Sequence, residues 1–333
     1  MSLREKLNLE HPVVQAGMGG GIADGLLAGT VSAAGGLGTV GILPPAQMRR
    51  ELDRAREIAD GRAVAANLLV PFATADHVDA CAGRADAVVL HGGLDRGLVE
   101  QIKRRDIPVL CTVGTEEEAR RALTDGADGL VVQGVEAGGH LVGVEPAVKA
   151  LGRVRDVSNG APVLLAGGVA DHADVRHALD AGADAVVAGT RFLLSEECPA
   201  HPEYKRRVLE AERTVETQLF GIGWPMRHRV VPNAALKRWG GGDELGLRPV
   251  RALQSLSAPL GSRLPQSLAA RMIHLQRPWL PLFGPSAPLE GMPARTVDAG
   301  PLYAGETALR IDSVVPAAEA VKLLAGVERA APA

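Results

Sequence analysis

The sequence has few cysteines, and their arrangement suggests neither a metal site nor disulfides. Cys81, Cys111 and Cys198 are odd in number, far apart and outside any CxxC pair, which argues against a disulfide framework and against a zinc site. We interpret them as buried or incidental thiols. Histidines predict no metal site either, because His172 and His177 lack the i, i+4 spacing of a helical metal pair and no HExxH motif occurs.

Long blocks of like charge and long apolar runs are also missing. The chain has 36 basic and 39 acidic residues, and neither sign is gathered into a block, so neither nucleic acid nor a membrane surface is an expected partner. No apolar stretch reaches the length of a membrane span, and the N-terminal MSLREKLNLEHP has charges where a secretory signal would be apolar. The sequence therefore predicts a cytoplasmic protein that binds a small molecule.

What the sequence does have is apolar residues in a repeating order. With 46% hydrophobic residues in 333, the chain can bury a large core, as one big domain or as a domain with an appendage. Short β-branched runs without polar alternation, typical of parallel strands covered on both faces, occur eight times between residues 12 and 192: PVVQAGM, GLGTVGI, AVAANLLV, ADAVVLHGG, IPVLCTVGT, GLVVQGVEAGG, PVLLAGG and AVVAGTRF.

Segments with helical spacing lie between most of these runs, at 45–60, 115–126 and 171–182. The second of them has Thr115 as its expected N-cap. The segments 84–92, 126–134 and 182–190 repeat one plan, a helix end followed by a strand. Alternating strands and helices predict an α/β fold, and eight strands fit a closed (β/α)₈ TIM barrel better than an open doubly wound sheet.

The pattern changes after Phe192. One helix is predicted over 201–220, and the segment 221–300 is rich in proline and glycine, with helical patches around 248–256 and 265–276 and all three tryptophans. We expect an inserted subdomain or lid at 197–300, on a barrel made of 1–196 and 301–333, with a closing helix at 315–330. A disordered tail fits less well, because tryptophans favour burial.

Two glycine-containing loops predict a phosphate site. AGGVADHADV (166–175) and AGTRF (188–192) follow the seventh and eighth predicted strands, where TIM barrels usually bind phosphate. Gly167 and Gly168 let backbone N–H groups approach an anion, and the Thr190 hydroxyl can donate a hydrogen bond. The alternative is that these are tight turns only. GGLGTVG (35–41) contains a G-x-G-x-x-G pattern, but ILPP follows it instead of a helix, so we reject a dinucleotide fold there.

The stretch QGVEAGGHLVG (133–143) follows the sixth predicted strand, at the same face of the barrel. Gln133 offers an amide to the edge of a heterocycle, and Gly138 and Gly139 leave space for a flat ring or a phosphate contact. His140 is expected to point into the same cavity. A structural histidine that only hydrogen-bonds the loop backbone is the competing interpretation.

GVEAGGHLVG, together with PVVQAGMGGGIA, ANLLV, LLAGGVAD, AGTRFL and LYAGET, resembles the nitronate monooxygenase family, formerly called 2-nitropropane dioxygenases. The resemblance extends from about residue 11 to 325 and is weakest over 221–300. It implies a TIM barrel that binds FMN, with His140 as the catalytic residue. The FMN contacts expected from this resemblance and from the glycine loops are Gly17, Met18, Asn67, Gln133, Gly138, Gly139, Gly167, Gly168, Val187, Ala188, Gly189 and Thr190.

The resemblance also implies an activity: oxidation of alkyl nitronates, and of nitroalkanes if His140 removes the α-proton, with O₂ to a carbonyl compound and nitrite. His140, titrating near neutrality, would act as base or hydrogen-bond donor. His91 and Tyr303 are candidates for the substrate pocket, each with simple packing as its alternative. Two alternative functions are an NAD(P)H-dependent flavin reductase of quinones or enoyl thioesters and a non-catalytic barrel that binds a phosphate ligand.

Two positions depart from the family's pattern. The first strand ends in Gln15–Ala16–Gly17–Met18, with glycine where the family commonly has proline, and the fourth ends in LHGG (90–93) in place of an aromatic–glycine pair. Both lie where the predicted strands reach the active face, so they bear on substrate choice more than on flavin binding.

Overall fold

The computed structural model describes residues 7–261 and 275–327. Parallel strands follow one another in the order β1-β9-β8-β6-β5-β4-β3-β2, and Leu37 N donates to Val13 O while Gln15 N donates to Leu37 O, which joins the two edge strands into a barrel. The predicted TIM barrel and its eight strands are confirmed: β1 Val13–Gln15, β2 Gly38–Val40, β3 Val64–Leu69, β4 Ala87–His91, β5 Val109–Val113, β6 Gly129–Gln133, β8 Val163–Ala166 and β9 Ala185–Ala188.

Alternate residues of each strand fill the barrel interior. Side chains two positions apart point to the same face of a strand, and one layer takes a single residue from each strand or its approach: Val14, Leu37, Ala65, Ala87, Leu110, Val131, Leu164 and Ala185. Leu7 and Leu9 close this layer from below. The next inward positions toward the carboxyl ends include Asn67, Thr112 and Gln133, so polar side chains replace apolar ones where the barrel opens.

Helices surround the barrel, and the remaining strand faces pack against them. The three helices expected from spacing are confirmed as α3 Pro45–Ala59, α6 Glu116–Thr124 and α8 His172–Asp180. Thr115 accepts a hydrogen bond from Glu118 N as the predicted N-cap. The closing helix is α15 Ala317–Ala325, which contacts α2 and α8. The others are α2 Gly25–Ala33, α4 Ala75–Cys81, α5 Arg96–Lys103 and α7 Ala147–Val157, with short η1 Val70–Phe72, α9 Thr190–Leu193 and η3 Glu306–Arg310.

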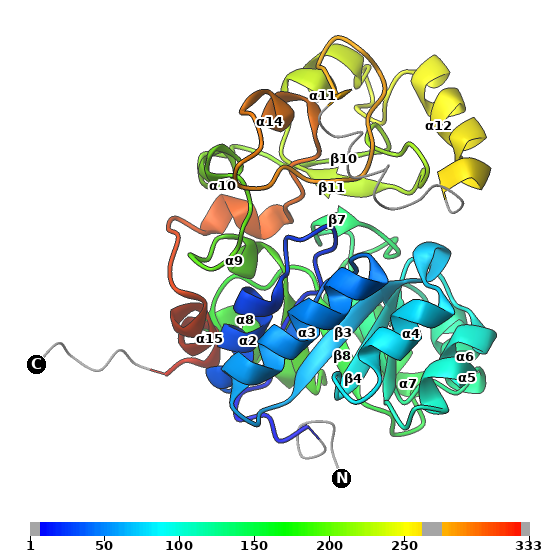
Figure 1. Cartoon of the computed structure of the whole chain (residues 1–333), viewed down its shortest axis with the longest axis vertical. Helices are drawn as coiled ribbons and strands as arrows, with labels where there is room; N and C mark the ends of the chain where they lie inside the picture. The colour runs from blue at the N-terminus through cyan, green and yellow to red at the C-terminus, as the bar shows by residue number, and fades with distance from the viewer. Residues whose placement is uncertain (1–6, 262–274, 328–333) are drawn as a thin grey trace, which may run out of the picture.

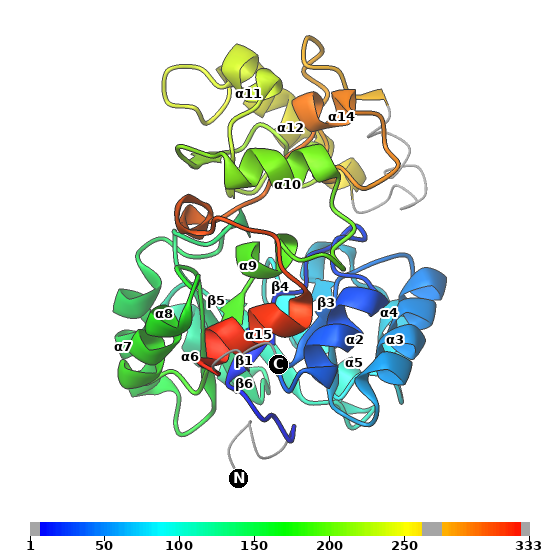
Figure 2. The same ribbon diagram turned by 90° about the vertical axis from the view of Figure 1, so that its left-hand side faces the viewer.

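A second layer lies over the carboxyl ends of the strands, opposite the N-terminus (Figures 1 and 2). It has its own apolar core around Phe220 and Phe283. The described elements of this layer, which we call the lid, are α10 Pro202–Leu209, β10 Val215–Thr217, β11 His228–Val230, α11 Ala234–Trp239, α12 Arg248–Gly261 and α14 Arg295–Ala299. The exact division at residues 197 and 300 stays a prediction.

The single helix predicted over 201–220 is wrong. Helix α10 ends at Leu209, and the β-branched residues Val215 and Thr217 form β10, which pairs antiparallel with β11. Long-range pairing with β11 outweighs the helical spacing of this segment. The helical patch at 248–256 is confirmed within α12, whereas most of the patch at 265–276 lies outside the described residues.

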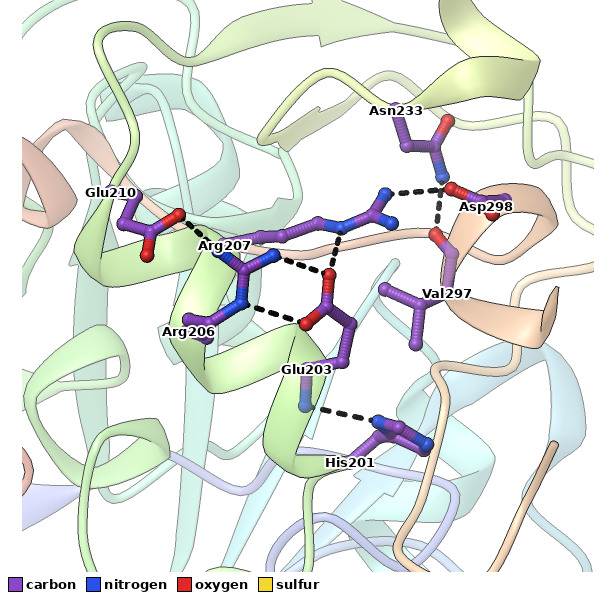
Figure 3. Close-up of polar contacts among 8 residues, drawn as sticks. All are labelled: His201, Glu203, Arg206, Arg207, Glu210, Asn233, Val297 and Asp298. Atoms are coloured by element: carbon purple, nitrogen blue, oxygen red, sulfur yellow. Dashed lines mark hydrogen bonds and ion pairs between the residues drawn. The ribbon is translucent and has the colours of Figure 1, made fainter. Parts of the chain in front are cut away.

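Polar contacts tie the lid together internally (Figure 3). Arg207 on α10 pairs with Asp298 on α14 at 2.8 Å. The buried Asn233, the N-cap of α11, donates to Val297 O at 3.0 Å and to Gly300 O at 2.7 Å. These contacts therefore hold three lid helices to one another.

Candidate active site

One cavity of about 680 Å³ lies between the carboxyl ends of the barrel strands and the lid. This volume is in the range of small-ligand and cofactor pockets. All the site residues predicted from the sequence line it: Gly17, Met18, Asn67, His91, Gln133, Gly138, Gly139, His140, Gly167, Gly168, Val187, Ala188, Gly189, Thr190 and Tyr303. Their individual roles stay predictions, but the fold brings them to one place.

The β8–β9 side of the cavity is built from backbone. Gly167 and Gly168 have φ values of +113° and +77°, which only glycine adopts at little cost. Gly189 caps the short helix α9, whose first N–H groups have no partner within the helix. The Thr190 hydroxyl oxygen accepts from Gly305 N at 2.9 Å, which leaves its proton to donate. These groups suit a phosphate.

Asn67 and Gln133 are two of the polar side chains at the carboxyl ends of the barrel strands. Asn67 donates from Nδ2 to Val89 O at 3.0 Å, while its buried Oδ1 has no partner among the described residues. Gln133 donates to His140 O at 3.1 Å and accepts from Val142 N at 2.8 Å. Asn67 thus offers an unused acceptor to a ring N–H, whereas the amide of Gln133 fixes the loop that carries His140.

Two glycines are required by close packing. A Cβ on Gly17 would lie 2.2 Å from Cβ of Asn67, and a Cβ on Gly138 would lie 2.5 Å from Gly305 N. Gly17 replaces the proline that the family commonly has at this position. Because it lacks a Cβ, the side chain of Asn67 can pack directly against the chain after β1. A larger residue at position 17 would displace that amide.

His140 is held by the lid. It forms β7, Gly139–His140, which pairs with β11 so that His140 lies opposite His228 (Figure 1). Its ring stacks on Trp224 with centroids 3.8 Å apart and planes 23° from parallel. Its Nε2 is buried and has no hydrogen-bond partner among the described residues. Burial lowers the pKa of His140 well below 6.5, with smaller contributions from His228 and His91. The predicted titration near neutrality is therefore wrong, and the imidazole is neutral at physiological pH.

Aromatic rings and imidazoles surround His140. The ring centroids of His228 and Tyr303 lie 5.2 and 5.3 Å from that of His140. The rings of Trp224 and Phe72 are nearly perpendicular, with centroids 5.5 Å apart. Burial lowers the pKa of both His91 and His228 to about 4. Tyr303 donates to Pro285 O at 2.9 Å, which orients its ring at the cavity wall.

Three of these neighbours were not predicted as site residues. Trp224 and His228 lie in 221–300, where no steady period marks strands, and Phe72 lies in a three-residue helical turn. The β-branched HRVV (228–231) is the one signal that could have suggested a strand there. To predict that this strand pairs with Gly139–His140, one would need to know of a contact between residues almost ninety positions apart along the chain.

Arg229, beside His228, joins the lid to the barrel. Its Nε donates to Val135 O at 2.8 Å in the loop after β6. Its Nη2 lies 3.3 Å from both Glu216 on β10 and Glu306 in η3. The loop that presents His140 is therefore fixed to both layers.

Within residues 7–261 and 275–327, none of the helices combines the length and apolarity needed to cross a bilayer. No group of three or more His, Cys, Asp or Glu side chains in those ranges is arranged to hold a metal ion.

Comparison with known proteins identifies the family. The nitronate monooxygenase family matches residues 1–79 and 75–326. The chain belongs to this family. Family membership confirms the resemblance predicted from GVEAGGHLVG and indicates a flavin-dependent oxidoreductase.

Individual relatives differ in the chemistry their names give. The nitroalkane oxidase of Streptomyces ansochromogenes has a TM-score of 0.74 and 26% identity, over 98% of this chain and 97% of that one. FabK of Thermotoga maritima has a TM-score of 0.75 and 26% identity, over 97% and 94%. A Mycobacterium tuberculosis (3aS,4S,5R,7aS)-5-hydroxy-7a-methyl-1-oxo-octahydro-1H-indene-4-carboxyl-CoA dehydrogenase is 33% identical over 256 residues, 72% of this chain and 68% of that protein.

Proposed function

We propose that the protein binds FMN and oxidises alkyl nitronates with O₂ to carbonyl compounds and nitrite. The observation that carries the proposal is the position of His140, a neutral imidazole in the same cavity as the glycine loops predicted to bind phosphate. The balanced net reaction takes two nitronate ions and one O₂ to two carbonyl molecules and two nitrite ions.

The cavity fits FMN in two respects. Gly167, Gly168 and the start of α9 offer backbone N–H groups to its phosphate. The buried Oδ1 of Asn67, which no described residue pairs with, suits a ring N–H on the isoalloxazine. When bound, FMN would supply the electron acceptor of the oxidation, and the protein would supply orientation and hydrogen bonds.

The cavity charge favours a small substrate over a second nucleotide. Among the described residues that line the cavity, Glu136 is the one with a formal charge, and no lysine or arginine is present. The pyrophosphate of NAD(P)H or coenzyme A would therefore find no cation in the wall, although such groups are usually bound by Arg or Lys. A nitronate carries one delocalised charge, which a single hydrogen-bond donor can meet.

His140 is suited to hold the nitro oxygens. A neutral imidazole presents one N–H donor, and an oxygen of the substrate would pair with the ring nitrogen Nε2, which has no partner within 7–261 and 275–327. Its lowered pKa makes it a weak base. The site therefore favours preformed nitronates over neutral nitroalkanes, whose α-proton must first be removed.

A second candidate function follows from the mycobacterial relative, whose name describes a carboxyl-CoA thioester as its substrate. On that proposal the enzyme oxidises or reduces a thioester and exchanges electrons with NAD(P)H. Family membership in an oxidoreductase group argues against the third alternative, a non-catalytic phosphate-binding barrel.

The two candidates are separated by anaerobic spectroscopy of the FMN-loaded protein. Propyl-2-nitronate and NADH are added in separate cuvettes, and the flavin absorbance is followed. Bleaching by nitronate but not by NADH supports nitronate oxidation. Bleaching by NADH alone supports the thioester candidate, and a protein that binds no FMN contradicts both.

A further inference from the structure

We propose that Trp224 determines substrate size: its indole limits the space beside His140 and restricts turnover to nitronates with small substituents at the reacting carbon. This inference rests on the proposed function. Trp224 is 6% exposed, lines the cavity and stacks on His140 at 3.8 Å. Of the residues described here as lining the cavity, it contributes the largest side chain.

Contacts on several sides hold the indole in place. One face stacks on His140, and the ring centroids of Phe72 and His91 lie 5.5 and 6.4 Å from that of Trp224, with both rings nearly perpendicular to the indole. Phe72 follows β3 and His91 ends β4. The indole thus closes the β3–β4 side of the cavity between the barrel and His140.

The backbone that carries Trp224 is also fixed. Trp224 N donates to Gly221 O at 3.0 Å, and Met226 N donates to Trp224 O at 2.8 Å. Gly223 N donates to the hydroxyl of Ser257 on α12 at 2.9 Å. Because hydrogen bonds hold this turn against α12, the indole has a fixed position in the cavity wall. We therefore expect it to limit the size of the substrate.

Gly92 provides the room for this wall. It has φ +80°, and a Cβ there would lie 2.7 Å from Cζ2 of Trp224. A side chain at position 92 therefore requires a shift of the indole or of the backbone, and we expect the indole to move away from the end of β4, into the cavity. The neighbouring Gly93 also has a positive φ, +145°, but a Cβ there would make an ordinary van der Waals contact with Val70, at 3.5 Å, and would not touch Trp224.

Substitutions at Trp224 and at Gly92 should change the preference between bulky and small nitronates in opposite directions. Trp224→Phe and Trp224→Ala enlarge the space beside His140, so the ratio of kcat/KM for a bulky nitronate to that for a small one should rise. Gly92→Ala pushes the indole inward, so the ratio should fall. Changes of a few methylenes in an apolar pocket are worth about tenfold or more in such ratios.

The test measures kcat/KM for the nitronates of nitroethane, 2-nitropropane and nitrocyclohexane with FMN-loaded enzyme. The expected result is a rise of about tenfold or more in the cyclohexyl-to-ethyl ratio for Trp224→Phe and a fall for Gly92→Ala. Trp279→Phe, at a tryptophan that is 62% exposed, and Gly93→Ala, which has the backbone strain without the contact, should leave the ratio unchanged. An unchanged ratio in soluble, FMN-loaded Trp224→Phe would overturn the inference.

A binding measurement separates this inference from the proposed function. Calorimetric titration with nitroethane and nitrocyclohexane measures affinity without turnover, and Trp224→Phe should improve binding of the larger compound relative to the smaller. If the wild type oxidises no nitronate but this shift in affinity occurs, the proposed reaction fails and the role of Trp224 stands. If neither compound binds the wild type or any variant, both are contradicted.

Discussion

The two walls of the cavity are built in different ways. The barrel wall consists of glycines and backbone N–H groups at the ends of β8 and β9, within short local motifs. The lid wall consists of the rings of Trp224, Tyr303 and His140. Trp224 lies in the lid between β10 and β11, while His140 and Tyr303 come from barrel segments that pair with β11. Backbone groups in the barrel wall suit a cofactor that stays the same among related enzymes. Side chains in the lid wall can be replaced by mutation, which suits a substrate that differs from one enzyme to another.

If the walls are divided in this way, His140→Ala should abolish most of the activity and leave cofactor binding intact. We expect kcat/KM for propyl-2-nitronate to fall by about 10²–10⁴-fold, the typical contribution of a positioned proton donor or base. Steady-state oxygen consumption and the FMN content of the purified protein measure the two properties. His177→Ala, on the exposed side of α8, is the control. Loss of FMN together with activity would place His140 on the cofactor side.

Arg229→Met should loosen the lid wall from the barrel wall. The change leaves Val135 O without its donor and removes the ion pairs of Arg229 with Glu306 and with Glu216, which keeps its pair with Arg227. We therefore expect the free energy of unfolding to fall by about 2–3 kcal/mol. Denaturant titration measures this. Arg213→Met removes an exposed pair with Glu244 and should cost less than about 1 kcal/mol. Equal losses in the two variants would show that Arg229 does not link the layers.

Gly167→Ala should damage the barrel wall alone. Gly167 and Gly182 have similar φ values, +113° and +102°, so both substitutions strain the backbone, but only Gly167 lines the cavity. We expect FMN to bind about tenfold more weakly to Gly167→Ala, by fluorescence titration, since one misplaced phosphate contact is worth roughly 1.4 kcal/mol. FMN affinity unaffected by Gly167→Ala, or equally reduced by Gly182→Ala, would contradict phosphate binding at this loop.

The buried histidines of the lid wall predict a pH-dependent stability. The pKa of His228 is lowered to about 4 in the folded protein, while the unfolded chain titrates near 6.5. Below pH 6.5 the unfolded state binds more protons, so stability falls as pH decreases from 6.5 toward 4 and is constant above that range. Thermal unfolding of the wild type and His228→Gln between pH 4 and 8 tests this. The difference between them should shrink at low pH, and a constant difference would contradict it.

Prediction from the sequence succeeded where signals are local. Eight apolar runs define the strands. Because side chains alternate with a period of two along a strand, the positions of Asn67 on β3 and Gln133 on β6 direct both side chains into the barrel. The glycine loops after β8 and β9 lie at the same end of the barrel for the same reason, and their binding of phosphate stays a prediction. These features need only the barrel's regular geometry to be placed.

The lid wall could not be predicted because its signals are long-range. Helical spacing over 201–220 suggested one helix, but pairing with β11 turns its second half into β10. Trp224 and His228 come into contact with His140 only through that sheet. The neutral state of His140 also follows from burial by these neighbours, which the motif around it does not reveal.

The most direct test of the division between the two walls is a crystal structure of the FMN-loaded enzyme soaked with a nitroalkane. The account predicts the FMN phosphate against Gly167, Gly168 and Thr190, a ring N–H on Asn67, and the nitro group on His140 beneath Trp224. A phosphate at any other loop, or a nitro group distant from His140, would contradict it.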